Sequence, residues 1–361
     1  MMSSIVGSVV EKKVAMAHDV GGDLGNAWLK TNSAGSGAFA LKSWKADESV
    51  VLEANPGYRG GAPALKRVIV RHIPEPAAQR LQLEKGDIDI ARDLTPDQVA
   101  GVAGNKDIVV SLAPQATQAY VGMNLKTPQL ANVKVRQALR YLVDYDGMVG
   151  SFLKGQFQVH QSFWPSGFWA SLADNPYKFD PAKAKALLTE AGLPNGFEVT
   201  LDAQNSAPYV NIAQSIQSTM AQGGVKVTII PSEQKTLLTK YRARQHQMLL
   251  VYWGPDYMDP HTNADSFARN IDNSDNPKSK PLAWRNSWDI PEISKLTDAA
   301  VRERDMKKRE QDYLDLQKKV LDEGPFIILF QETKQVATRA NVKNFVVGPS
   351  SDVVFYQLAT K

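Results

Sequence analysis

The sequence predicts an α/β fold, because short apolar runs alternate with segments that carry helix signals along most of its 361 residues. The apolar runs are bounded by glycine and proline, which is typical of buried strands. Several intervening segments begin with a capping residue followed by proline, as at Thr95-Pro96 and Asp180-Pro181. Residues 197–230 follow the order strand, helix, strand, which predicts a parallel, right-handed βαβ unit. A chain of this length favours two domains or more.

The first part of the chain is expected to be mixed in structure. Residues 1–30 predict one or two helices with Ile5, Val6, Val9 and Val10 on one apolar face. Strands are expected at residues 39–43, 49–54, 67–72, 87–90, 108–112 and 119–124, and helices at 74–85 and from Thr95 onward.

The remainder of the chain continues the alternation of helices and strands. The helix expected at residues 133–149 is amphipathic, with Val135, Ala138, Leu139 and Leu142 on one face. Further helices are expected from Pro181 to Gly192, at 208–222, at 233–244 with Ser232 as its cap, and after Pro291 and Asp305. Strands are expected at 197–201, 225–230, 248–252 and 326–330, with two short strand-like runs in 342–358.

Composition excludes several classes of function. The formal net charge is only +4 and the basic residues are scattered among acidic ones, so a nucleic-acid partner is not expected. No apolar run is long enough to span a bilayer. Cysteine is absent and the five histidines lack zinc-site spacing, so neither a metal site nor a cofactor is predicted. Residues 1–10 lack a basic region and a cleavage site, so no signal peptide is expected in this chain.

The strongest candidate for a binding site is the stretch Met248 to Pro260. Its first five residues predict a buried strand, which Gly254 and Pro255 end. The residues just beyond the strand's carboxyl end, where α/β sheets bind ligands, are aromatic and acidic: Trp253, Gly254, Asp256, Tyr257 and Asp259. Aromatic surface beside carboxylates suits a small cationic or zwitterionic ligand. The alternative is a buried strand followed by a turn whose aspartates cap backbone groups.

Two other stretches allow a functional interpretation. Residues 155–178 are long, irregular and rich in aromatic side chains, as functional loops are. For most of these aromatics we favour the alternative that they pin the loop to its own domain. The charge-dense run at 302–319 has mixed signs, and Tyr313, Leu316 and Val320 keep helical spacing, so it predicts a solvated helix face.

Several motifs together resemble the extracytoplasmic solute-binding proteins of ABC peptide transporters, a family that binds dipeptides, oligopeptides, nickel and related solutes. Each motif is short, but they occur in the family's order over nearly the whole chain. They are S-A-G-S-G-A-F-A-L-K-S-W (33–44), E-A-N-P-G-Y-R-G-G-A-P-A-L (53–65), L-E-K-G-D-I-D-I (83–90), V-K-V-R-Q-A-L-R-Y-L-V-D-Y-D-G-M-V (133–149), Y-K-F-D-P-A-K-A-K-A-L-L-T-E-A-G-L-P-N-G-F (177–197) and W-G-P-D-Y-M-D-P (253–260).

The resemblance implies the type II periplasmic-binding-protein fold, in which two α/β lobes are joined by a hinge and enclose the ligand. It places a remnant of an N-terminal small domain at residues 1–19, lobe one at 20–125, lobe two at 126–328 and a return to lobe one at 329–361. Most of the small domain, the first strands of lobe one and the signal peptide are expected to be missing from this chain.

The resemblance also assigns a role to the candidate site. In peptide-binding members an aspartate in the pattern W-x-x-D-Y pairs with the ligand's α-ammonium, and the matching residue here is Asp256, beside Trp253 and Tyr257. Some oligopeptide binders carry an arginine in the strand before the tryptophan, whereas this chain has only apolar and tyrosine side chains there. The group that would receive a ligand carboxylate is therefore not identified. Arg242 and Arg244 are candidates, although we favour a surface-helix role for both.

The function implied is that of a monomeric, periplasmic binding protein that captures a peptide-like solute by lobe closure and presents it to a membrane permease, without catalysis. One alternative is the same scaffold with an oligosaccharide, an opine or a metal chelate as its solute. A more remote alternative is a hydrolase that uses Asp256 and Asp259 as an acid–base pair. Nothing else in the sequence supports an enzyme, because it has no nucleophile elbow, metal motif or phosphate loop.

Overall fold

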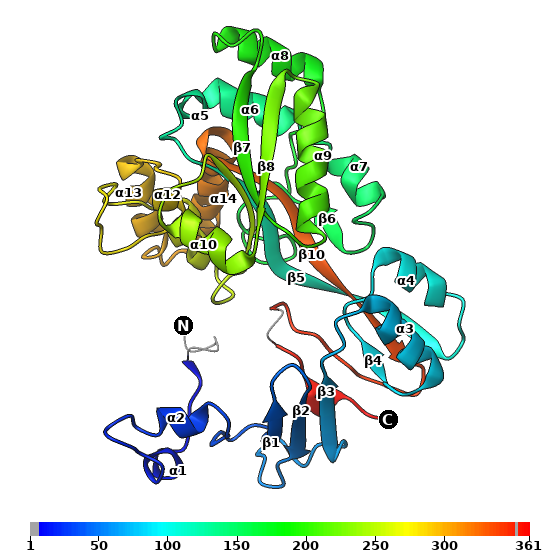
Figure 1. Cartoon of the computed structure of the whole chain (residues 1–361). Coiled ribbons are helices and arrows are strands. Elements are labelled where there is room, and N and C mark those ends of the chain that lie inside the picture. The colour runs from blue at the N-terminus through cyan, green and yellow to red at the C-terminus, as the bar shows by residue number, and fades with distance from the viewer. Residues whose placement is uncertain (1–6, 351–352) are drawn as a thin grey trace. The chain divides into compact units, whose positions relative to one another are not determined.

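The computed structural model describes residues 7–350 and 353–361, and Figure 1 labels most of its elements. The chain divides into two compact units. Unit 1 comprises Met1–Gln115 and Lys334–Lys361, and unit 2 comprises Ala116–Thr333. The chain passes from unit 1 to unit 2 within β5 (Ile108–Met123) and returns within β10 (Phe326–Arg339).

Unit 1 contains a three-stranded antiparallel sheet in the order β1–β2–β3 and a separate group of helices around the ends of β5 and β10. The second group packs around a small core that includes Leu83, Val102, Ile108 and Ala337. The elements of unit 1 are α1 (Lys12–Met16), α2 (Asn26–Leu29), β1 (Phe39–Lys45), β2 (Ser49–Ala54), β3 (Arg67–Arg71), α3 (Pro76–Lys85), β4 (Ile90–Ala91), α4 (Pro96–Val102) and the 3-10 helix η2 (Tyr356–Leu358).

Unit 2 is built on a sheet in the order β10–β5–β9–β7–β8, with β6 paired to β10. β7 runs parallel to both β8 and β9, as the predicted βαβ unit requires, and β9 runs antiparallel to β5. The other elements are α5 (Pro128–Ala131), α6 (Val133–Tyr141), α7 (Tyr145–Gly150), β6 (Phe157–Val159), α8 (Pro181–Glu190), β7 (Phe197–Gln204), α9 (Tyr209–Ala221), β8 (Val225–Ser232), α10 (Gln234–Arg242), β9 (Met248–Trp253), α11 (Pro260–Phe267), α12 (Leu282–Arg285), α13 (Pro291–Ala300) and α14 (Met306–Glu323).

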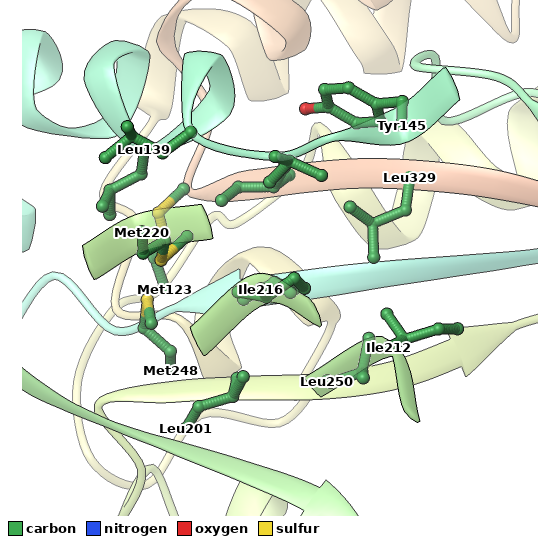
Figure 2. Close-up of a cluster of buried hydrophobic side chains, with 14 of the residues drawn as sticks. Met123, Leu139, Tyr145, Leu201, Ile212, Ile216, Met220, Met248, Leu250 and Leu329 are labelled. Atoms are coloured by element: carbon green, nitrogen blue, oxygen red, sulfur yellow. The ribbon is translucent and has the colours of Figure 1, made fainter. Parts of the chain in front are cut away.

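The central strands of this sheet are covered on both faces, which explains their continuous apolar runs. Met248 and Leu250 of β9 belong to one core, whereas Leu249 and Val251 belong to the other, because successive side chains of a strand point to opposite faces. Figure 2 shows the first core, where side chains from β5, β7, β9 and β10 meet those from α6, α7 and α9. The second core contains residues of α10 to α14.

Some predicted boundaries in the middle of the chain are wrong. β5 is one continuous strand rather than two, since Pro114 removes one N–H donor without ending the strand. The helix expected at 133–149 is two helices, because the Asp144 side chain accepts the N–H of Gly147 at 2.9 Å and begins α7 as a cap. Ser232 ends β8 instead of capping α10, whose capping position is Glu233.

The two ends of the chain also differ from expectation. Val9 and Val10 are exposed and precede α1, so they form no apolar helix face, while Ile5 and Val6 lie outside the described residues. At the other end, the described residues of 342–358 form the isolated bridges Lys343↔Thr360 and Val347↔Val354 in place of the expected strands. Within the described ranges, none of the helices has both the length and the apolar character needed to cross a bilayer.

Candidate functional site

The candidate site begins where β9 ends in unit 2. β9 lies between β5 and β7, and its last residue, Trp253, is opposite Gln118 of β5. A turn at residues 254–259 follows, and then α11 begins at Pro260. The turn therefore lies at the carboxyl edge of β9 and its parallel neighbour β7, which is where the sequence placed it.

The indole of Trp253 is half-buried and held at one edge. Its Nε1 donates a hydrogen bond to Oδ1 of Asn263 at 3.0 Å. Its ring packs edge-on against Phe267, with 6.2 Å between centroids and an interplanar angle of 90°. Buried tryptophans usually find such a partner for the indole N–H, which fixes the ring while part of its surface stays accessible.

Asp256 presents an exposed carboxylate in this turn, and its backbone N–H donates to Oγ1 of Thr262 at 3.3 Å. Partial burial raises the pKa of the neighbouring Tyr257, and the carboxylates of Asp259, Asp265 and Asp256 raise it further. The Arg309 guanidinium lowers the same pKa, so three carboxylates and one cation act on the Tyr257 hydroxyl.

Asp259 has partners of its own. Its Oδ1 accepts the backbone N–H of His261 at 3.0 Å and so caps α11. Both carboxylate oxygens also bind the Arg309 guanidinium of α14, at 2.8 and 2.9 Å. The alternative interpretation of the sequence, that an aspartate here caps backbone groups, thus describes Asp259.

The structure has room for a larger side chain in place of Gly254. A Cβ at this position would meet only Oγ1 of Thr117, at an ordinary contact distance of 3.6 Å. The φ angle of Gly254 is not positive, so the backbone conformation does not require glycine here either.

Arg244 is not a surface-helix residue, as the sequence suggested, but a buried one beyond the end of α10. Its guanidinium lies over the Trp284 ring at 4.3 Å and donates to the carbonyl oxygens of Asn273 and Ser274. It therefore fixes the segment after α11 rather than serving a ligand carboxylate. Arg242 is exposed at the last position of α10, as expected.

Most aromatics of residues 155–178 pin that loop to unit 2, as the sequence indicated. Phe163 and Trp164 are buried in the second core, and Phe157 and Tyr177 in the first. Trp169 differs, because it is 37% exposed and the Arg309 guanidinium lies over its ring at 5.2 Å. This loop thus approaches the turn through Arg309 and Asp259.

Sequence reasoning missed Thr262, Asn263 and Arg309. The first two follow Asp259-Pro260, a helix-start signal of the same kind as Asp180-Pro181, so α11 could have been found. Arg309 lies fifty residues further along the chain and carries no local signal. In residues 7–350 and 353–361, no group of three or more His, Cys, Asp and Glu side chains is placed to hold a metal ion.

Comparison with known proteins identifies the family to which this chain belongs. Residues 3–275 match the sequence model of the family described as "Bacterial extracellular solute-binding proteins, family 5 Middle". The chain is 31% identical to the probable D,D-dipeptide-binding periplasmic protein DdpA of Escherichia coli K12, over 96% of this chain and 66% of that protein. It is 28% identical to the dipeptide-binding protein of the same organism, over 89% and 60% of the two chains. The chain thus spans slightly less than two thirds of these relatives' lengths.

A solved structure also supports the fold. The periplasmic binding protein DppA from Helicobacter pylori, in complex with the peptide STSA, superposes with a TM-score of 0.81. It is 25% identical, and the match covers 95% of this chain and 66% of that one. The α/β fold of type II periplasmic binding proteins, which the family resemblance implied, is confirmed.

Proposed function

Because the chain belongs to family 5 of the bacterial extracellular solute-binding proteins, we propose that it is the solute-binding component of an ABC importer. In this proposal it captures a peptide-like solute outside the cytoplasm, as a monomer, and delivers it to a membrane permease. The names of its relatives support a peptide ligand, since they include dipeptide-binding proteins. Units 1 and 2 are the candidates for the two lobes expected of the family.

The observation that supports the proposal most strongly is the exposed Asp256 in the turn at the carboxyl edge of the sheet, where Trp253 and Tyr257 also lie. We assign Asp256 to the ligand's ammonium group, and Trp253 and Tyr257 to its apolar part. Gly254 leaves room for the ligand backbone to approach. Asp259 belongs to the site through its bonds to α11 and Arg309, which hold the turn in place.

The ion pair between Asp259 and Arg309 also argues against the hydrolase alternative. An acid–base pair needs two carboxylates that can exchange protons with a substrate. One of this pair, Asp259, is already bound by the Arg309 guanidinium and by the backbone N–H of His261. Binding without catalysis is the function that this arrangement favours.

The test is a titration of the purified chain with dialanine and trialanine and with their N-acetylated forms. A free amine should be required, because acetylation removes the charge that Asp256 would receive. Equal binding of free and acetylated peptides would contradict the ammonium assignment. Binding of an oligosaccharide, an opine or a metal chelate instead of any peptide would replace the solute class and keep the importer function.

A further inference from the structure

The buried side-chain amide of Asn263 lies directly behind the tryptophan of the candidate site. Asn263 belongs to α11 and is 0% exposed. Its Oδ1 accepts the hydrogen bond from Nε1 of Trp253, and its Nδ2 donates to the carbonyl oxygen of Phe163 at 2.5 Å. The two ends of one amide thus connect the site to the loop at residues 155–178.

The surroundings of this amide restrict its rotation. The Phe163 ring stacks on Phe267 of the same helix, with 5.9 Å between centroids and 9° between planes. Trp253 packs edge-on against that same Phe267. Turning the Asn263 amide would break both of its hydrogen bonds in a buried environment, which is unfavourable. The indole therefore has one favoured orientation.

We propose that Asn263 is a positioning residue for ligand binding, which fixes the Trp253 indole without touching the ligand. This inference rests on the proposed function and deepens it. A ligand-contact surface that is already ordered loses less conformational freedom on binding, which raises affinity. Without Asn263, the indole N–H must either remain unpaired or rotate toward water, and both changes disturb the surface next to Asp256.

The first test needs no ligand. The protein is labelled with ¹⁵N-tryptophan, and the signal of the Trp253 indole N–H is identified by its absence from Trp253→Phe. In Asn263→Ala this signal should shift, and its proton should exchange faster with water. Asn286→Ala is the matched control, because Asn286 is equally buried in unit 2 but bonds to Tyr241 and His246. The control should destabilise the protein and leave the Trp253 signal in place.

The second test measures coupling through binding of trialanine. Asn263→Ala should weaken affinity about fivefold to tenfold, the loss expected for one hydrogen bond. In the Trp253→Phe background the same substitution should change affinity less than about twofold, because the indole N–H is already gone. Asn286→Ala should bind as the wild type does. Far-UV circular dichroism checks that each variant is folded.

The outcomes separate this inference from the proposed function. An unchanged Trp253 signal in Asn263→Ala overturns the positioning role. A shifted signal with unchanged affinity also overturns it, while leaving the proposed function intact if Asp256→Asn still weakens binding. Equal losses for Asn263→Ala in both backgrounds would show that it acts independently of Trp253. If the wild-type chain binds no peptide, the proposed function fails, and the role in peptide affinity fails with it.

Discussion

At the residue scale, the candidate site combines fixed aromatic surface with one exposed carboxylate. Trp253 is held by Asn263, and the backbone of Asp256 is held by Thr262. The Asp256 carboxylate itself is exposed to solvent. A ligand ammonium that reaches it gains a charge-assisted hydrogen bond without displacing a cation of the described residues.

Gly254→Ala distinguishes a structural glycine from one that makes room for a ligand. The new methyl group meets only Thr117 at an ordinary contact distance, so the free energy of unfolding should change by less than about 0.5 kcal/mol. Peptide affinity should nevertheless fall, because the methyl occupies space assigned to the ligand. Urea unfolding and calorimetric titration measure the two effects. A loss of stability as large as the loss of affinity would contradict the assignment.

At the element scale, α11 organises the site. Its capping residue Asp259, and Thr262 and Asn263 in its first turns, each bond to a different part of the preceding turn or to a neighbouring element. This helix could be predicted from Asp259-Pro260. The side chains that it brings into contact with Phe163 and Arg309 could not, because those contacts depend on packing between segments distant in sequence.

Two substitutions at Asp259 separate its two roles. Asp259→Asn keeps an oxygen that can cap α11 but removes the charge paired with Arg309, and should destabilise the protein by about 1 kcal/mol. Asp259→Ala loses the cap as well and should cost about 2 kcal/mol in total. Chemical unfolding measures both values. As a control, Arg309→Gln should cost at least as much as Asp259→Asn, because it removes the same ion pair and also the contact with the Trp169 ring. Combining the two substitutions should cost little more than Arg309→Gln alone. Fully additive losses would contradict a direct pair.

At the scale of the whole molecule, unit 2 supplies a sheet that is covered on both faces and that ends in the candidate site. The strands of this sheet were predictable because their apolar runs are short and bounded by breakers. The continuity of β5 was not, since Pro114 and its polar neighbours carry loop signals that pairing within the sheet overrides. The fold class, in contrast, follows from the order of elements and was confirmed.

The buried His246 should make the stability of the protein depend on pH. Burial lowers the pKa of His246 to about 4, against about 6.5 in an unfolded chain. Between pH 4 and pH 6.5 the unfolded state binds a proton at His246 that the folded state does not bind. The stabilisation that comes from keeping His246 neutral is therefore complete above pH 6.5 and is lost as the pH falls toward 4. The loss at pH 5 should be about 2 kcal/mol relative to pH 7.5. Urea unfolding at pH 5 and at pH 7.5 measures this loss of stability. In His246→Gln the part of the pH dependence that His246 causes should be absent. Identical pH dependences of the two proteins would contradict it.

One calorimetric comparison tests whether Asp256 receives the ammonium group of a peptide ligand. Wild type, Asp256→Asn and Asp174→Asn are titrated with the same free-amine peptide; Asp174 is an exposed carboxylate elsewhere in unit 2. Asp256→Asn keeps the side chain's shape and removes its charge. Affinity should fall about 10- to 100-fold, the equivalent of a charge-assisted hydrogen bond. Asp174→Asn should bind as the wild type does. Unchanged affinity in Asp256→Asn would contradict this assignment.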